Sequence, residues 1–138
     1  ERRETLGVPV VGVGTDSFTA FYTNTSTVPV AERVDELDAL AHLVALRLDG
    51  RYGAGGALVV NRVPEDADVG AEAAEAMVRV ALDRAAADQA RGAAATPAAL
   101  AYINAHAGGR FLETNIAVVE ANATLAGKLA VALAGVGA

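Results

Sequence analysis

Residues 7–22 read Gly7-Val-Pro-Val-Val-Gly-Val-Gly-Thr-Asp-Ser-Phe-Thr-Ala-Phe-Tyr22. The apolar run Val8–Val13 predicts a buried strand, because strands covered on both faces lack the alternation of apolar and polar residues. Gly12 and Gly14 predict a turn that lets this strand pack closely. They do not make a dinucleotide-binding loop, because the third glycine, the following helix and the later acidic residue of that motif are all missing.

The rest of the chain reads as further strands followed by helices. Three more extended segments are expected, at Phe18–Thr23, Val28–Val34 and Ala57–Val60. Four helices are expected from apolar periodicity and end signals: one from the cap Asp35 to the stop Gly50, one over Ala71–Arg91 with Gly92 as its stop, one from the cap Thr96-Pro97 to Gly108-Gly109, and one over Glu113–Ala134. The last helix is apolar on nearly every face, which predicts that it is buried between other elements.

This order of elements predicts an α/β fold. We expect a partial α/β/α layered sheet of about four strands with C-terminal helices, in which residues 1–138 form one unit of a larger fold. Residues 1–7 read as the last turn of a helix with Gly7 just past its end. Since a domain seldom begins with the end of a helix, we expect this chain to be cut from a longer protein.

Composition limits the classes of function. The chain has 138 residues, no cysteine and a net charge of -6. The missing cysteines exclude disulfides and thiolate metal sites and fit a reducing cytoplasm. The acidic balance argues against binding to bare nucleic acid. No membrane span is expected, since Glu120, Asn122 and Lys128 interrupt the most apolar segment.

A second segment carries the most specific signal. It reads Gly108-Gly-Arg-Phe-Leu-Glu-Thr-Asn-Ile-Ala-Val-Val-Glu-Ala-Asn122. Together with residues 7–22 it closely resembles the C-terminal half of the pseudouridine-5'-phosphate glycosidase family, and the resemblance runs in register from about Glu4 to about Ala134. The first segment keeps the family's pattern at Thr15, Asp16, Phe18, Ala20 and Phe21.

The chain departs from the family's pattern at a few positions. Val13 stands where a tyrosine is common, and Thr19 where a proline is common. Residues 61–66 resemble the family's Ala-Asn-Pro-Ile-Pro-Glu-Glu loop, in which Asn61, Pro64 and Glu65 match, but Arg62 replaces its first proline and is expected to loosen the loop. Ala98 and Ala99 replace a bulkier Phe-Leu pair after the helix start, so packing there must differ.

The resemblance implies a homotrimeric α/β/α enzyme that reversibly cleaves the C–C glycosidic bond of pseudouridine 5'-phosphate to uracil and ribose 5-phosphate. In that family a lysine forms an imine with the sugar, a glutamate transfers protons, and an aspartate holds a manganese ion. All three precede the segment that matches Gly7 onward, so no catalytic or metal-binding residue is expected in this chain. The sole lysine, Lys128, lies in the last helix, unrelated to the nucleophile.

Two asparagines are the candidate substrate-binding residues. By the resemblance, Asn115 matches the asparagine of the family's Ser/Ala-Asn-Ile motif, which helps to hold the substrate. Asn61 could face a substrate from the end of a strand, although an asparagine before a turn is also ordinary. Asn122 lies seven residues after Asn115, on the same face of the helix, so this pair could instead form interhelical hydrogen bonds.

Other polar residues carry weaker signals. His42 is expected to be solvated and His106 to lie near a helix end beside Tyr102; with no carboxylate at ligand spacing, they make no metal site. The acids Glu65, Asp66 and Glu113 are read as solvated or capping residues. Glycosylation patterns begin at Asn24 and Asn122, and they mean nothing without secretion.

Three interpretations of function stay open. The first is the C-terminal portion of a pseudouridine-5'-phosphate glycosidase. The second is a catalytically inactive remnant that serves as a structural or oligomerising module. The third is a stand-alone ligand-binding module, against which an apolar strand edge without a neighbour would argue.

Overall fold

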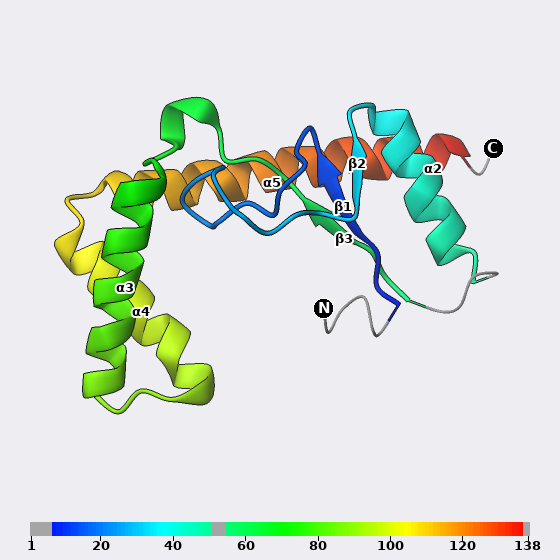
Figure 1. Ribbon diagram of the computed structural model, residues 1–138. Helices are drawn as coiled ribbons and strands as arrows, with labels where there is room; N and C mark the ends of the chain where they lie inside the picture. Colours follow the sequence, from blue (N-terminus) through cyan, green and yellow to red (C-terminus); the bar gives the residue numbers. More distant parts are fainter. Residues whose placement is uncertain (1–6, 51–54, 137–138) are drawn as a thin grey trace.

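The computed structural model describes residues 7–50 and 55–136. The predicted helix end before Gly7 lies outside these ranges. The described elements are β1 (Val10–Val13), β2 (Glu32–Val34), α2 (Leu37–Leu48), β3 (Leu58–Val60), α3 (Ala71–Ala87), α4 (Ala95–His106) and α5 (Arg110–Val136), with single 3-10 turns η1 (Glu65–Ala67) and η2 (Gly92–Ala94). The predicted α/β class is confirmed (Figure 1).

The sheet is parallel, in the order β2-β1-β3. Its central strand is the predicted one, and Val11 there is fully buried. The described part of the sheet has three strands where about four were predicted, and the predicted strand at Phe18–Thr23 is wrong because this segment forms no strand. Ala20 and Thr23 instead exchange two backbone hydrogen bonds of 3.0 and 2.7 Å. This tight turn uses the groups that a ladder would need.

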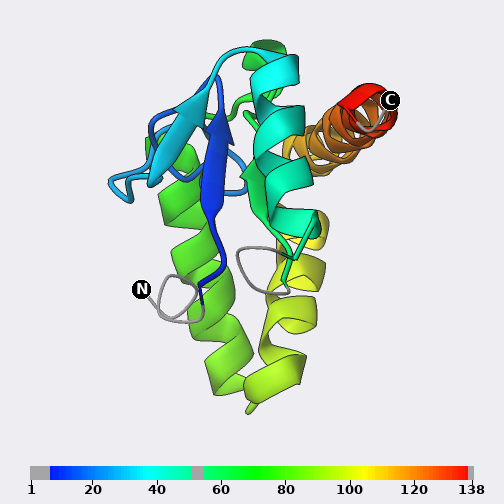
Figure 2. The same cartoon turned by 90° about the vertical axis from the view of Figure 1, so that its right-hand side faces the viewer.

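Helices flank the sheet on one side. Figure 2 shows the strands, α2 and α5 in that order across the molecule, so α2 packs between the sheet and the C-terminal half of α5. The hairpin of α3 and α4 stands away from the sheet at the other end of α5 (Figure 1). The core of this end joins Tyr22 and Phe111, whose ring centroids lie 4.8 Å apart, to apolar residues of the two hairpin helices, namely Ala74, Ala81, Ala99 and Ile103.

The C-terminal end of α3 differs from the prediction, because backbone hydrogen bonds cap the helix before Gly92. α3 ends at Ala87, not Arg91, because Gln89 adopts a left-handed φ of 59°. The N–H groups of Gln89 and Ala90 donate to the carbonyls of Ala86 and Ala85, which is the Schellman pattern. Gly92 therefore does not end α3; it opens the turn η2.

Helix starts also shift. α4 begins at Ala95, so Thr96-Pro97 lies within the first turn, where a proline is tolerated. Its predicted stop at Gly108-Gly109 is confirmed, since both glycines have positive φ. The N-cap of α2 is Glu36 rather than Asp35, because the Asp35 carboxylate accepts two bonds from Arg33 at 2.8 and 2.9 Å.

The last helix, α5, begins three residues earlier than predicted and is not enclosed. Only Phe111 and Thr114 of its 27 residues are buried within the described part of the chain. Four large apolar side chains are exposed, namely Leu112, Ile116, Val119 and Val131. The prediction that this helix is buried between other elements is therefore wrong for the described residues. The cause is that α2, α4 and the loop after β3 contact α5 from one side only.

By length and composition, α5 is the one helix of the described ranges that could cross a bilayer, with a mean hydropathy of 1.5 over its most apolar window. From the sequence alone we expected no membrane span here, because Glu120, Asn122 and Lys128 interrupt the segment. By length and mean hydropathy, however, α5 qualifies as a candidate. The structure gives α5 another role, because it packs along α2 and receives a hydrogen bond from the loop after β3. We therefore treat it as a packing helix of the fold.

Candidate functional site

The candidate site lies where β1 and β3 end. The carboxyl ends of parallel strands meet at one edge of a sheet, and open α/β sheets bind their ligands there. The segment after β1 begins with the predicted glycine turn. Gly14 has a φ of 63°, and a Cβ on Gly12 would lie 2.2 Å from the Thr15 carbonyl oxygen. The turn is thus a close-packed support for the edge, as predicted.

Asn61 is the hub of this edge. Its backbone carbonyl accepts a hydrogen bond from the Thr19 hydroxyl at 3.1 Å, which ties the loop after β1 to the end of β3. Its side-chain Oδ1 accepts from the Arg62 backbone N–H at 3.0 Å. Its Nδ2 donates to Oδ1 of Asn122 at 3.2 Å. The Asn61 amide is therefore fixed in orientation, with one N–H still free to donate.

Two of these donors sit at the positions that depart from the family's pattern. A proline in place of Thr19 would have no hydroxyl, and a proline in place of Arg62 would have no backbone N–H. Both departures supply a hydrogen bond to Asn61 that proline could not make. The Arg62 backbone N–H thus helps to orient the Asn61 side chain.

A second set of hydrogen bonds holds the loop between β3 and α3. We call it the loop clamp, and its residues are Asn24, Asp68 and Thr114. The Asn24 side chain exchanges two bonds of 2.8 Å with the backbone N–H and carbonyl of Val63. The Asp68 carboxylate accepts 2.8 Å bonds from the backbone N–H groups of Asn24 and Gly70. Partial burial raises the pKa of Asp68, but these donated bonds outweigh it and hold the pKa below its usual value.

The start of α5 is tied to the same loop. The Thr114 hydroxyl is buried and lies 2.6 Å from the Ala67 carbonyl oxygen and 2.9 Å from that of Arg110. The Arg110 guanidinium donates to the carbonyls of Asp66 and Asp68, both at 3.3 Å. These contacts fix the position of Asn115, which is the next residue along the helix.

Asn115 is half-buried, and its side chain makes no hydrogen bond to any described residue. Asn122 lies two turns further on, roughly 10 Å along the axis, and its bond goes to Asn61 in a loop. The alternative that Asn115 and Asn122 serve interhelical bonds therefore finds no support among the described residues. Asn115 lies on the same side of α5 as Asn122, whose amide meets that of Asn61 at the sheet edge.

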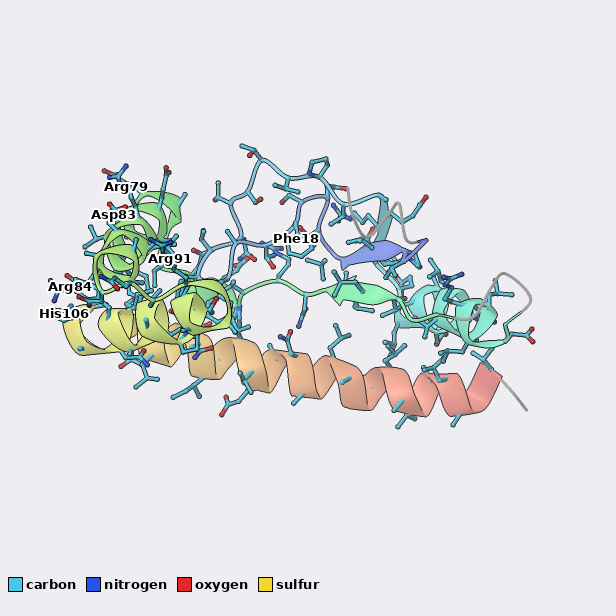
Figure 3. The ribbon with its side chains drawn as sticks, turned by 90° about the horizontal axis from the view of Figure 1, so that it is seen from below. Phe18, Arg79, Asp83, Arg84, Arg91 and His106 are labelled. Carbon is cyan, nitrogen blue, oxygen red and sulfur yellow. The ribbon has the colours of Figure 1, made fainter. Side chains whose placement is uncertain are left out.

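The remaining polar candidates lie elsewhere. His106 stacks on Tyr102, with ring centroids 4.1 Å apart, on the hairpin far from Phe18 at the sheet edge (Figure 3). His42 is exposed on α2 and contacts the Asp38 carbonyl through Nδ1. The acids Glu65, Asp66 and Glu113 and the cation Lys128 are all exposed. Within residues 7–50 and 55–136, no three His, Cys, Asp or Glu residues gather as metal ligands.

The sequence did not single out the clamp residues. Asn24 carries only the start of a glycosylation pattern, and Asp68 and Thr114 match no functional motif. Each bonds a residue about 40 positions away along the chain. Their signal in the sequence is only that of polar residues in loops or at a helix start, which is too common to identify them.

A groove opens beside the loop that follows β1. It has a volume of about 740 Å³ and lies between the loop after β1 and the first half of α3. The exposed ring of Phe21 and the buried Tyr22 line it together with four hydroxyl side chains, those of Thr23, Thr25, Ser26 and Thr27. Asn61, Asn115 and Asn122 do not line this groove, so it is separate from the sheet edge at Asn61.

The family model described as Indigoidine synthase A like protein matches residues 1–132. The chain belongs to this family. Among curated relatives, a pseudouridine-5'-phosphate glycosidase of Gemmatimonas aurantiaca is 43% identical over 134 residues, which are 96% of this chain and 43% of that protein. The enzyme of the same name from Methylobacterium nodulans is 44% identical over 135 residues, covering 98% of this chain and 40% of the relative.

Two solved structures share the fold. A prealnumycin C-glycosynthase, AlnA, in complex with ribulose 5-phosphate superposes with a TM-score of 0.83 at 28% identity, over 96% of this chain and 43% of that one. An indigoidine synthase A-like protein of Thermotoga maritima gives a TM-score of 0.79 at 27% identity, over 95% and 42%. This chain therefore spans less than half the length of the relatives it matches, and it corresponds to their C-terminal half.

Proposed function

We propose that this chain is the C-terminal part of an enzyme that reversibly cleaves the C-glycosidic bond of pseudouridine 5'-phosphate to uracil and ribose 5-phosphate. The observation that carries the proposal is the identity of 43% over 96% of the chain with a relative named for this activity. The C-glycosynthase among the structural neighbours supports chemistry at a C-glycosidic bond.

In this proposal Asn115 and Asn61 bind the substrate. An amide offers both donors and an acceptor, which suits the alternating N–H and C=O groups of a uracil ring. Asn115 is the better candidate, because its half-buried amide has no hydrogen bond among the described residues and lies on the same side of α5 as Asn122. Asn61 retains one free N–H, and Asn122 orients it.

The reacting groups would lie in the part of the enzyme that this chain does not match. A C-glycoside has no good leaving group, so an imine formed by a lysine, with proton transfer by a glutamate, would divide one hard step into easier ones. The described residues do not fit a manganese site, since no cluster of ligands is present in residues 7–50 and 55–136. We assign the manganese to the same unmatched part, and we propose a cytoplasmic homotrimer for the whole enzyme.

The test compares two proteins. One is this chain, and the other is a chimaera in which the unmatched part of the Gemmatimonas aurantiaca relative precedes it. Each is incubated with pseudouridine 5'-phosphate and Mn²⁺, and uracil release is followed. We expect release from the chimaera alone. Asn115→Ala in the chimaera should raise KM at least tenfold, whereas Asn104→Ala at an exposed position of α4 should leave it unchanged.

The second candidate is a catalytically inactive remnant that serves as a structural or oligomerising module. The exposed apolar side chains of Leu112, Ile116 and Val119 on α5 favour it, because an exposed apolar patch marks an interaction surface. A folded chimaera that releases no uracil, while the Gemmatimonas aurantiaca enzyme does so under the same conditions, would establish this alternative. Uracil release by the short chain would instead contradict our assignment of the reacting groups.

A further inference from the structure

The two side-chain amides at the end of β3 have a fixed polarity, because one of their partners can only donate. A backbone N–H has no lone pair, so the Asn61 atom that lies 3.0 Å from the Arg62 backbone nitrogen is the carbonyl oxygen, Oδ1. Nδ2 of Asn61 is then the atom that lies 3.2 Å from Asn122, and the Asn122 atom that accepts its hydrogen bond is Oδ1. The Arg62 N–H therefore orients both amides.

This order leaves N–H groups unused at the edge. Asn61 keeps one N–H and Asn122 keeps two, and none of them bonds any described residue. Asn122 is exposed, so water can accept from its N–H groups, whereas Asn61 is half-buried. A buried N–H without a partner is rarer in proteins than a carbonyl with one unused lone pair. The unused N–H of Asn61 is therefore the group that most needs an acceptor.

The Arg62 N–H decides which way the two amides point. The oxygen and nitrogen of an amide have almost the same shape, so each side chain can turn by half a rotation without a change in packing. If both turned together, the bond between Asn61 and Asn122 would survive with its direction reversed. The turned order would set Nδ2 of Asn61 against the Arg62 N–H, and both of these groups are donors. That contact leaves a donor unpaired, so the observed order is the stable one.

We infer that Arg62 is a positioning residue that acts through its backbone N–H, and that the edge at Asn61 binds an acceptor oxygen of the ligand rather than an N–H group. In the proposed reaction two kinds of ligand oxygen fit, namely the carbonyls of the uracil ring and the oxygens of the sugar phosphate. The identity of the ligand rests on the proposed function. The orientation of the amides does not, because it follows from contacts within this chain.

The orientation is tested in the 138-residue chain by hydrogen exchange of the Arg62 backbone amide. Asn61→Asp keeps an acceptor for this N–H, so the amide should exchange no faster than in the parent. Asn61→Ala removes the acceptor, and exchange should become about tenfold faster, the factor expected for one lost hydrogen bond. Equal rates in the parent and Asn61→Ala would overturn the inference, because the Arg62 N–H would then orient nothing.

The ligand is tested in the chimaera with Mn²⁺, by calorimetric titration with uracil and, separately, with ribose 5-phosphate. Arg62→Pro and Arg62→Ala both remove the exposed ion pair of 3.5 Å with Glu65, but only the proline also removes the N–H. We expect Arg62→Pro to raise the Kd of one of the two ligands about tenfold, and Arg62→Ala to keep it within about twofold. Asn61→Asp, which cannot donate, should weaken the same ligand about tenfold. The same change at the exposed Asn104 should have no effect.

The two ligands identify the oxygen. A loss confined to uracil assigns a carbonyl of the base, and a loss confined to ribose 5-phosphate assigns an oxygen of the sugar phosphate. Four results would overturn the inference: equal weakening by both Arg62 variants, no weakening by Asn61→Asp, equal weakening of both ligands, or no binding of either ligand to the folded chimaera. A chimaera that shows the expected losses in binding but releases no uracil would contradict the proposed function alone.

Discussion

Gly12→Ala tests whether the glycine turn after β1 is as tightly packed as the structure shows. A Cβ at this position would lie 2.2 Å from the Thr15 carbonyl oxygen and 2.9 Å from Cγ2 of Val30. The nearer atom belongs to the backbone, so it cannot move away by a change of rotamer. Relief requires a shift of about 1 Å in the turn, because a carbon and an oxygen normally stay more than about 3 Å apart.

The cost follows from what the shift disturbs. Overpacking a well-packed site costs about 1–3 kcal/mol. The turn also contains the paired bonds of 2.9 and 3.3 Å between the Thr15 side chain and the Ser17 backbone, and losing their geometry adds about 1 kcal/mol. We therefore expect Gly12→Ala to lower the free energy of unfolding by about 3 kcal/mol, which corresponds to a fall of roughly 10 °C in Tm for a chain of this size.

Gly127→Ala is the control. Gly127 lies inside α5, and a Cβ there meets nothing within 4 Å. Since alanine favours the helix, this variant should gain about 0.5–1 kcal/mol. Thermal unfolding followed by circular dichroism compares the two variants with the parent. A Tm for Gly12→Ala within 2 °C of the parent would refute the reasoning, because the turn would then be free to move.

Two further predictions concern the loop clamp. Because the hydrogen bonds hold the folded pKa of Asp68 below its unfolded value, the carboxylate stabilises the fold above about pH 4, and this contribution is lost as the pH falls through the folded pKa. Asp68→Asn should therefore lower the midpoint of urea unfolding at pH 7, and the midpoint should then fall less steeply below pH 5 than in the parent. Asp66→Asn at an exposed site should follow the parent. The same dependence of the midpoint on pH in both variants would contradict this. Thr114→Val should lower the free energy of unfolding by about 1–2 kcal/mol, since it removes a buried donor from the Ala67 carbonyl. Thr124→Val on the exposed side of α5 should change it by less than about 0.5 kcal/mol. Equal midpoints for the two threonine variants in urea unfolding would contradict the role of Thr114.

Local patterns in the sequence predicted the elements whose cause is local. The run Val8–Val13 became the central strand, and the glycines at 50, 108 and 109 end their helices with positive φ. The end of α3 was missed because its left-handed residue is Gln89, a residue type that gives no stop signal. The end of α3 is set by backbone hydrogen bonds that most residues can make. Gly92 therefore predicted the helix end in the wrong place.

Long-range contacts account for the other misses. Phe18–Thr23 has the composition of a strand, yet Tyr22 is drawn into the core with Phe111 and the segment turns. The apolar faces of α5 predicted burial, but exposure depends on what else is present around the helix. The resemblance to a family located Asn61 and Asn115, whereas Asn24 and Asp68 could not be found because their partners lie some 40 residues away.

The buried residues of the hairpin of α3 and α4 are small except for Ile103: Ala74, Ala81, Ala85 and Ala99 are buried along it. An alanine has no side-chain rotamers to lose, so burying these four alanines costs almost no side-chain conformational entropy. They also gain little apolar area for each contact. The hairpin is thus held by backbone order and close approach, and even one added methyl group at Ala81 would push the two helices apart.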